Sequence, residues 1–155
     1  MIYIVQRVGN IKYDRGGIWF TTISPENIFK LKKYEAMHYK EGYKIAQLDI
    51  HTPFYFFVGS NELDYPIDLY ATLTNWDSEL IGEEIRHRCK QFAITDDWKH
   101  NFNECIEREL SEMEQTTAKL LRSKGYDAVL FINDENGIPE QIFYIGDKRK
   151  IKWLN

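Results

Sequence analysis

The chain has 155 residues, of which 43% are apolar and 28% are charged, and its formal net charge is −4. This length lies near the commonest size for one domain, so we expect a single domain spanning residues 1–155. The composition excludes a disordered or fibrous chain. The acidic balance argues against a general nucleic-acid binder, because phosphate affinity needs clustered lysine and arginine.

Neither a secretory signal nor an apolar run long enough to span a bilayer is visible, so we expect a cytoplasmic protein with no membrane partner. The two cysteines, Cys89 and Cys105, lack CxxC spacing, which suits a reducing compartment and gives no metal framework. We therefore expect both to be plain side chains and expect no bound metal. A small basic cluster near the end of the chain, which we interpret as a solvated edge, consists of Lys148, Arg149, Lys150 and Lys152.

The first part of the chain predicts two strands followed by a helix. Residues 3–8 and 18–22 are rich in β-branched and aromatic residues, which favours strands, and glycines mark the turns between them. Ser24 supplies an N-cap and Pro25 suits the first helical position, so we expect a helix to begin there and to end at Gly42.

The middle of the chain predicts a strand and then a helix. Residues 43–58 are apolar and aromatic around an interruption at Thr52 and Pro53, which indicates one strand with a bend. Residues 63–73 fit either an irregular segment or a short helix. Apolar residues recur at spacings of three and four over residues 77–92, which indicates an amphipathic helix.

A longer helix and a hairpin complete the chain. The helix spans about residues 96–122 and stops at Gly125. Residues 127–132 and 141–145 are apolar strands joined by a turn at residues 133–137 that contains Asn-Gly, so we expect them to pair. This mixture of strands and helices indicates the α+β class.

The usual catalytic signatures are absent. The sequence lacks GxxxxGK[ST], a GxGxxG that opens a helix, HExxH and GxSxG. The four histidines lie far apart without metal-like spacing, and helix capping and solvation explain the paired carboxylates. Short motifs therefore assign no reaction.

The order of the segments carries more information than the motifs. The polar end of the first strand, at residues 6–9, precedes GGIWFTT at residues 16–22 and a capped helix. The chain closes with KGYDAVLF at residues 124–131 and QIFYI at residues 141–145. This pattern resembles the ADP-ribosyltransferase-like domains, especially the compact phage and bacterial versions. The resemblance spans nearly the whole chain, and the final hairpin is its most specific part.

The resemblance implies a split, strongly curved antiparallel β core with flanking helices, which grips NAD in a cleft. Nicotinamide leaves and an acceptor attacks the ribose carbon through a cation-like transition state, much as in glycoside cleavage. Such a site needs a group that holds ribose or diphosphate, an aromatic or hydroxyl wall around nicotinamide, and a carboxylate that fixes a ribose hydroxyl. The expected substrate is NAD, and no metal is implied.

The NAD contacts carry over residue by residue. The first-strand role falls on Arg7, because arginine can pair bidentately with phosphate, and Gln6 is the register alternative. Two aromatic residues of the second strand would form the nicotinamide wall, although core packing takes at least one of them, and two hydroxyl residues follow. These positions are Trp19, Phe20, Thr21 and Thr22.

The carboxylate position departs from the family pattern. If QIFYI aligns with the family's last strand, the catalytic glutamate is replaced by Gln141, which can hydrogen-bond a hydroxyl but supplies no negative charge. Glu140 can serve only if the register slips or the strand starts with a bulge after Pro139, because adjacent strand residues face opposite sides. Otherwise Glu140 is a solvated charge at a turn. Asp127 and Asp147 are further candidates.

Three hypotheses follow. The first is an NAD-using mono-ADP-ribosyltransferase that modifies a macromolecule, most simply a protein, of the kind found among phage or toxin-type effectors. The second is a catalytically silent binding or inhibitor module on the same fold, which Gln141 favours. The third is an NAD glycohydrolase, which uses the same cleft with water as the acceptor. Nucleic acid is not an expected partner.

Overall fold

The computed structural model describes residues 2–7, 14–23, 44–57, 65–91, 98–132 and 139–154. Contacts divide the chain into two compact units. The first, called the sheet unit, comprises Met1–Lys12, Gly17–Ser60 and Leu121–Asn155. The second, called the helical unit, comprises Tyr13–Gly16 and Asn61–Leu120. The single domain expected for residues 1–155 stays a prediction.

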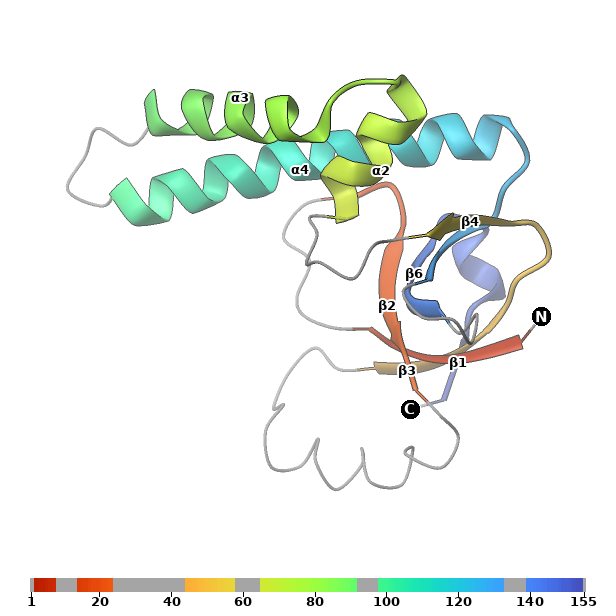
Figure 1. Cartoon of the computed structure of the whole chain (residues 1–155). Coiled ribbons are helices and arrows are strands. Elements are labelled where there is room, and N and C mark those ends of the chain that lie inside the picture. Colours follow the sequence, from red (N-terminus) through yellow and green to blue (C-terminus); the bar gives the residue numbers. More distant parts are fainter. Residues whose placement is uncertain are drawn as a thin grey trace. The chain divides into compact units, whose positions relative to one another are not determined.

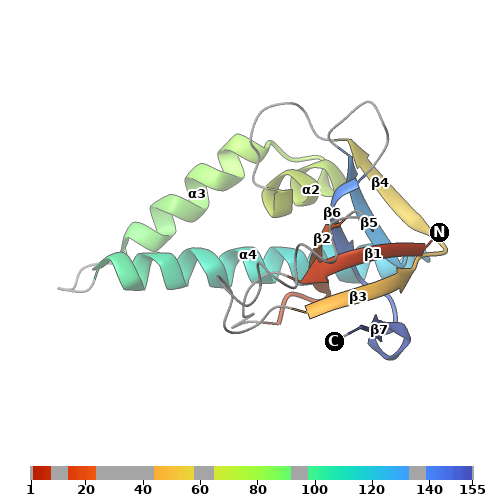
Figure 2. The ribbon, with the colours of Figure 1, turned by 90° about the horizontal axis from the view of Figure 1, so that it is seen from below.

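The strands of the sheet unit form one sheet. In the described part of the chain they are β1 (Ile2–Arg7), β2 (Ile18–Thr22), β3 (Lys44–Asp49), β4 (Pro53–Phe57), β5 (Ala128–Ile132), β6 (Pro139–Tyr144) and β7 (Lys152–Trp153). Their order is β4-β5-β6-β2-β1-β3-β7. Figure 1 shows the strands of the sheet, and Figure 2 shows β1, β3 and β7 side by side. Five of these neighbouring pairs are antiparallel. The β4–β5 pair is parallel, which departs from the antiparallel core that we expected.

One face of this sheet packs into a continuous apolar core. Phe20 on β2, Ile142 on β6 and Leu130 on β5 occupy one cross-strand row and are buried. Side chains two positions apart share a face, so alternate residues of the neighbouring strands join them. The core consists of Val5, Phe20, Ala46, Leu48, Ile50, Ala128, Leu130, Ile142, Tyr144 and Ile151. Such a core fixes the register of the strands, because a slip of one residue would expose it.

The glycine that precedes β2 has a packing reason. A Cβ atom on Gly17 would lie 2.6 Å from the carbonyl oxygen of Tyr144 and 2.8 Å from the ring of Phe143. Glycine removes that Cβ, so β2 can start directly against β6. The second glycine of GGIWFTT is therefore a close-approach position.

Helices make up most of the described part of the helical unit, which also includes residues 14–16. These helices are α2 (Tyr65–Thr74), α3 (Ser78–Gln91) and α4 (Trp98–Ser123). The end of α4, from Leu121 onward, belongs to the sheet unit. The Asp77 carboxylate caps α3, because it accepts the backbone N–H groups of Glu79 at 2.9 Å and Leu80 at 3.1 Å. The buried apolar core contains Ile67, Ala71, Ile81, Ile85, Cys89 and Cys105.

The expectation that Cys89 and Cys105 are plain side chains is wrong, because they form a disulfide. Both lie on the apolar faces of their helices, Cys89 in α3 and Cys105 in α4, and both are buried. Packing of α3 against α4 brings their Cα atoms to 5.4 Å, within the range for a bridge. The pairing depends on tertiary contact, which the spacing of the cysteines in the sequence does not reveal.

The prediction of one bent strand over residues 43–58 is also wrong. Two strands occupy this segment: β3 lies between β1 and β7, and β4 lies at the edge of the sheet. Asp127 fixes the turn between them, because its carboxylate accepts the backbone N–H of His51 at 2.8 Å and that of Thr52 at 3.0 Å. That carboxylate comes from a distant segment, so the interruption at Thr52 and Pro53 did not by itself distinguish a bend within one strand from a turn between two strands.

The other predicted elements agree with the structure wherever it describes them. The two N-terminal strands are β1 and β2, the final pair is β5 and β6, and the two amphipathic helices are α3 and α4. For residues 63–73 the short helix is confirmed as α2. The helix expected between Ser24 and Gly42 and the turn at residues 133–137 lie outside the described residues.

The α+β class is confirmed. No described helix combines the length and the apolar character that crossing a bilayer requires.

Candidate functional site

Three polar residues meet in register where β1, β2 and β6 lie side by side. Gln6 on β1 pairs with Thr21 on β2, and Thr21 pairs with Gln141 on β6. We call these residues the polar row. Cross-strand partners lie on the same side of a sheet, so the half-buried side chains of Thr21 and Gln141 are neighbours. For Gln6 the structure describes the backbone position.

Aromatic rings lie beside the polar row on the same side of the sheet. Trp19 is two residues from Thr21 and therefore shares its face. Its indole stacks on Phe143 of β6, with centroids 4.6 Å apart and planes inclined by 14°. Phe131 of β5 lies 5.2 Å from Trp19, and Phe56 of β4 lies 5.6 Å from Phe131. We call Trp19, Phe143, Phe131 and Phe56 the aromatic stack.

The indole of Trp19 carries a buried donor. Its Nε1 atom is buried and has no hydrogen-bond partner among the described residues. An unsatisfied buried donor costs about 1–3 kcal/mol, so such groups in a folded protein call for an explanation. A ligand with a carbonyl oxygen beside Trp19 could accept this hydrogen.

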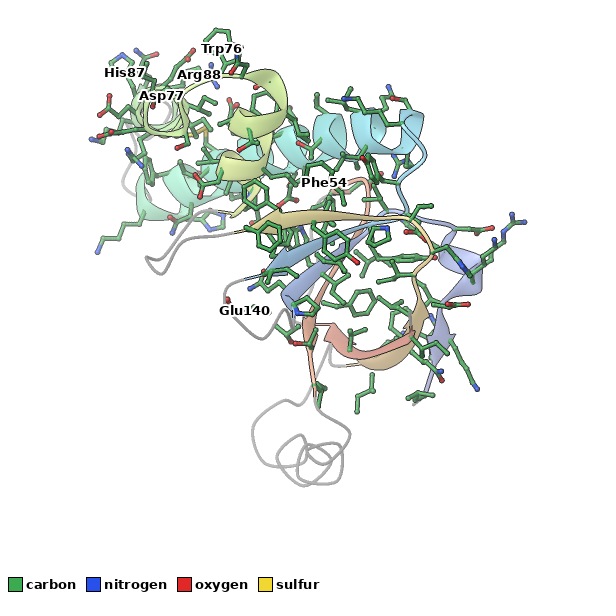
Figure 3. The ribbon with its side chains drawn as sticks, turned by 45° about the vertical axis from the view of Figure 1, so that its right-hand side comes forward. Phe54, Trp76, Asp77, His87, Arg88 and Glu140 are labelled. Carbon is green, nitrogen blue, oxygen red and sulfur yellow. A yellow bond between two sulfur atoms is a disulfide. The ribbon has the colours of Figure 1, made fainter. Side chains whose placement is uncertain are left out.

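A β-bulge stands at the start of β6. Phe131 pairs with Gln141 and Ile132 pairs with Pro139, so β6 advances by two residues where β5 advances by one. Glu140 is the extra residue of this bulge, and its side chain is exposed. Figure 3 labels Glu140, near the start of β6. Bulges re-aim side chains and often lie next to functional sites.

A hydrogen bond from β2 holds the bulge. The hydroxyl of Thr22 donates to the carbonyl oxygen of Pro139 at 2.7 Å. Thr22 therefore contacts the backbone of β6 at the residue before Glu140. The nicotinamide contact that the resemblance implied for Thr22 stays a prediction.

The remaining NAD-contact candidates, Phe20 and Arg7, do not lie in the polar row. Phe20 is 1% exposed and belongs to the apolar core, so core packing takes this residue of the expected wall. Arg7 pairs with Phe20, one position along β1 from the polar row, whereas Gln6 stands in the row itself. For Arg7, too, the structure describes the backbone position.

The two further carboxylate candidates have structural partners. Asp127 accepts the two backbone N–H groups of the β3–β4 turn, as described above. Asp147 accepts from the backbone N of Arg149 at 2.9 Å and from its guanidinium at 3.0 and 3.1 Å. These hydrogen bonds from Arg149 hold the pKa of the Asp147 carboxyl below its usual value. Each of these two carboxylates therefore has structural partners that account for its place in the fold.

The polar row, the aromatic stack and the bulge are thus the candidate site. The sequence-based candidates did not include the stack residues Phe131 and Phe143. A signal for them was present, because in AVLFI and QIFYI they alternate with the aliphatic residues of the apolar core and so lie on the opposite face of the sheet. Among the described residues no three His, Cys, Asp or Glu side chains gather as a metal site would require. Comparisons of this chain with protein-family models, with curated proteins and with solved structures find no match.

Proposed function

We propose that this protein is an NAD-dependent mono-ADP-ribosyltransferase that modifies a macromolecular target, most simply a protein. The observation that supports it most strongly is the polar row. The three segments to which the resemblance assigns NAD contacts are adjacent strands, and Gln6, Thr21 and Gln141 share one register row. A binding site needs such convergence of residues from distant parts of the chain.

The polar row and the two partly exposed members of the aromatic stack, Trp19 and Phe56, fit the nicotinamide end of NAD. The buried rings of Phe131 and Phe143 support them from within. Nicotinamide is a flat ring with a carboxamide, which suits an aromatic wall with a few oriented polar groups. The Nε1–H of Trp19 can donate to the carboxamide oxygen. The hydroxyl of Thr21 and the amide of Gln141 can bond the carboxamide or the ribose hydroxyls.

The proposed reaction exchanges one bond at the ribose C1′ atom for another. The bond between C1′ and the nicotinamide nitrogen breaks, and its electron pair leaves with nicotinamide. A nucleophilic atom of the target forms a new bond to C1′ and releases its proton to water. Positive charge develops on the ribose between these events, so a nearby carboxylate stabilises the transition state.

Glu140 is the residue that we assign to this carboxylate. The bulge removes the strict alternation that would send Glu140 and Gln141 to opposite sides of β6. In our proposal Glu140 supplies the negative charge, and Gln141 holds a ribose hydroxyl by hydrogen bonding. The glutamine at the family's glutamate position then has a binding role.

The direct test is an assay with NAD. Purified protein is incubated with NAD and a cell lysate, and mass spectrometry detects ADP-ribose on proteins and free ADP-ribose. We expect modified protein together with released nicotinamide. Absence of both products, together with no rise in melting temperature on addition of NAD, would overturn the enzyme proposal.

Variants at the bulge test the assignment of roles. Glu140→Gln should lower turnover by about 100-fold or more while NAD still raises the melting temperature, because the charge acts in the transition state. Gln141→Ala should weaken NAD binding instead. Glu112→Gln removes an exposed carboxylate in α4 and is the matched control. Loss of turnover in Gln141→Ala with full activity in Glu140→Gln would show that the assignment is reversed.

A catalytically silent binding module is the second candidate, and the neutral polar row favours it. Gln6, Thr21 and Gln141 can hydrogen-bond a ligand but carry no charge. This candidate predicts NAD-induced stabilisation, or partner binding, without release of nicotinamide. An NAD glycohydrolase would instead release free ADP-ribose in the absence of any lysate.

A further inference from the structure

Cations and exposed apolar side chains gather at the β3–β7 edge of the sheet unit. β7 pairs with β3 through Trp153 opposite Ala46 and Lys152 opposite Gln47. Figure 2 shows β7 and the end of the chain beside β3. The exposed residues of this region, called the basic edge, are Lys44, Lys148, Arg149, Lys150, Lys152, Trp153 and Leu154.

Within the described part of the chain, the lysines of the basic edge outnumber the acidic residues beside them. Arg149 is paired with Asp147 at 3.0 Å. The acidic residue of β3, Asp49, contacts His51 at 3.2 Å. None of the four lysines of the basic edge forms an ion pair with a described residue. A chain with net charge −4 therefore concentrates lysines at one edge, which suits an anionic surface.

The surroundings of Trp153 distinguish between anionic partners. The Lys44 Nζ lies over its ring, 5.4 Å from the centroid, and the ring of Phe20 lies 6.0 Å away. Single-stranded nucleic acid uses aromatic rings with a free face for base stacking. Trp153, with Lys44 and Phe20 already against it, does not offer an open stacking platform of that kind.

The exposed apolar residues favour a bilayer surface. Trp153 is 37% exposed and has Lys152 beside it in the sequence and Lys44 over its ring, and Leu154 is 44% exposed. Tryptophan and lysine together are typical of the membrane–water interface, where the ring sits at headgroup level and the ammonium groups meet lipid phosphates. Apolar contact and attraction to anionic lipid add to each other at such a surface.

We propose that the basic edge binds the surface of an anionic lipid bilayer. The lysines contact the lipid headgroups, and Trp153 and Leu154 lie at the boundary with the acyl chains. This binding does not depend on the proposed NAD chemistry. It departs from the expectation of no membrane partner, which rested on the lack of a signal and of a spanning segment.

The test measures sedimentation of the full chain with lipid vesicles. Vesicles of phosphatidylcholine alone are compared with vesicles that contain about 30% phosphatidylserine, a composition in which each lysine near the surface contributes about fivefold to binding. We expect binding to the anionic vesicles and its loss as salt rises. Failure to sediment with anionic vesicles at low salt would overturn the proposal.

Matched variants separate the basic edge from net charge. Lys148→Gln/Lys150→Gln/Lys152→Gln should weaken binding about 100-fold, by the same fivefold contribution of each lysine. The three corresponding arginine substitutions should retain binding, which excludes misfolding as the cause. Lys90→Gln/Arg108→Gln/Lys119→Gln changes the net charge equally on exposed residues of α3 and α4 and should leave binding unchanged. Equal loss in this control would contradict the proposal.

Two further measurements address the type of partner. Leu154→Gln should weaken vesicle binding several-fold, because it removes the apolar contact and no charge. Binding to single-stranded RNA or to a polyglutamate peptide is measured in parallel. Tighter binding to either polymer than to anionic vesicles, lost in the same triple glutamine variant, would overturn the membrane proposal in favour of that partner.

Discussion

The helical unit and the sheet unit use their polar residues in different ways. In the helical unit the Glu114 side chain is 1% exposed, and the Nη1 atom of Arg15 donates to its two carboxylate oxygens at 3.0 and 3.3 Å. In the sheet unit Thr21 and Gln141 are half-buried, and Glu140 is exposed. Buried charge is expensive unless it is paired, whereas polar groups nearer the surface keep contact with water. The difference shows that a buried ion pair stabilises the helical unit, and binding by the polar row of the sheet unit is our proposal.

Removal of Arg15 gives the largest expected effect on stability. Arg15→Ala leaves the buried Glu114 carboxylate without its guanidinium partner, so we expect a loss of about 3–5 kcal/mol in the free energy of unfolding. Urea unfolding followed by far-ultraviolet circular dichroism measures it, because the signal reports mainly on the helices.

An apolar replacement of the whole pair is the control. Arg15→Met with Glu114→Leu removes both charges, so most of the lost stability should return. A loss below about 1 kcal/mol in Arg15→Ala, the range of an exposed ion pair, would contradict a structural role for the buried pair.

Reduction of the disulfide gives the next largest effect. The bridge joins cysteines separated by 16 residues in sequence, and closing a loop of this size contributes about 3 kcal/mol. A reductant should lower the stability of the helical unit and raise hydrogen exchange in α3 and α4, while exchange in β2 and β6 stays the same. Cys89→Ala/Cys105→Ala should be insensitive to reductant. Equal exchange with and without reductant in the unaltered protein would contradict the prediction.

The sequence predicted most elements of both units, because local periodicity and caps determine them. The recurrence of apolar residues at spacings of three and four marked α3, and the β-branched and aromatic residues of 18–22 marked β2. Long-range contacts were not visible in the same way. The Asp127 carboxylate that separates β3 from β4 and the pairing of Cys89 with Cys105 each join segments that are distant in sequence.

Only part of the candidate site could be named from the sequence. The resemblance pointed to Arg7, with Gln6 as the alternative, and to residues 19–22 and 140–141, but it missed Phe131 and Phe143. Strand pairing brings Gln6, Thr21 and Gln141 into one row. Whether Gln6 or Arg7 stands in the row depends on the β1–β2 register, which two similar alternations leave open in the sequence. The sequence named a bulge as a condition for Glu140, but the bulge itself follows from the pairing of β5 with β6.

A substitution at Thr22 tests the role of a polar residue in the sheet unit and should affect stability less. Thr22→Val removes the hydroxyl that donates to Pro139, so we expect a loss of about 1 kcal/mol in the free energy of unfolding. If the bulge positions Glu140, NAD turnover should fall by a larger factor than stability explains. Thr22→Ser keeps the hydroxyl and should retain both. Unchanged turnover in Thr22→Val would remove Thr22 from the positioning role.

Asp68 in α2 gives the smallest expected effect and concerns pH. Burial raises the pKa of the Asp68 carboxyl, the hydrogen bond from Ser78 opposes this in part, and Oδ2 is buried without a hydrogen-bond partner among the described residues. The folded protein therefore holds this proton to higher pH than the unfolded chain. The stabilising contribution of the protonated form is present below the unfolded pKa of about 3.9 and is lost as pH rises through the folded pKa.

Comparison of Asp68→Asn with the unaltered protein isolates this contribution. The variant cannot ionise at this position, so its melting temperature relative to the unaltered protein should increase from about pH 3 to pH 7. Thermal unfolding across this range measures the difference. A difference that is constant with pH, or one that falls, would show that burial does not raise the Asp68 pKa.

The division of the chain bears on how the two units can be exchanged or engineered. Residues 61–120 form a continuous insertion in the chain between β4 and β5. The helical unit also includes Tyr13–Gly16, which comes from an earlier part of the chain. That short segment carries Arg15, the partner of Glu114. A graft of residues 61–120 onto another sheet would transfer the buried acid without its base. Recombination that preserves the helical unit must therefore move two separate pieces of the chain together.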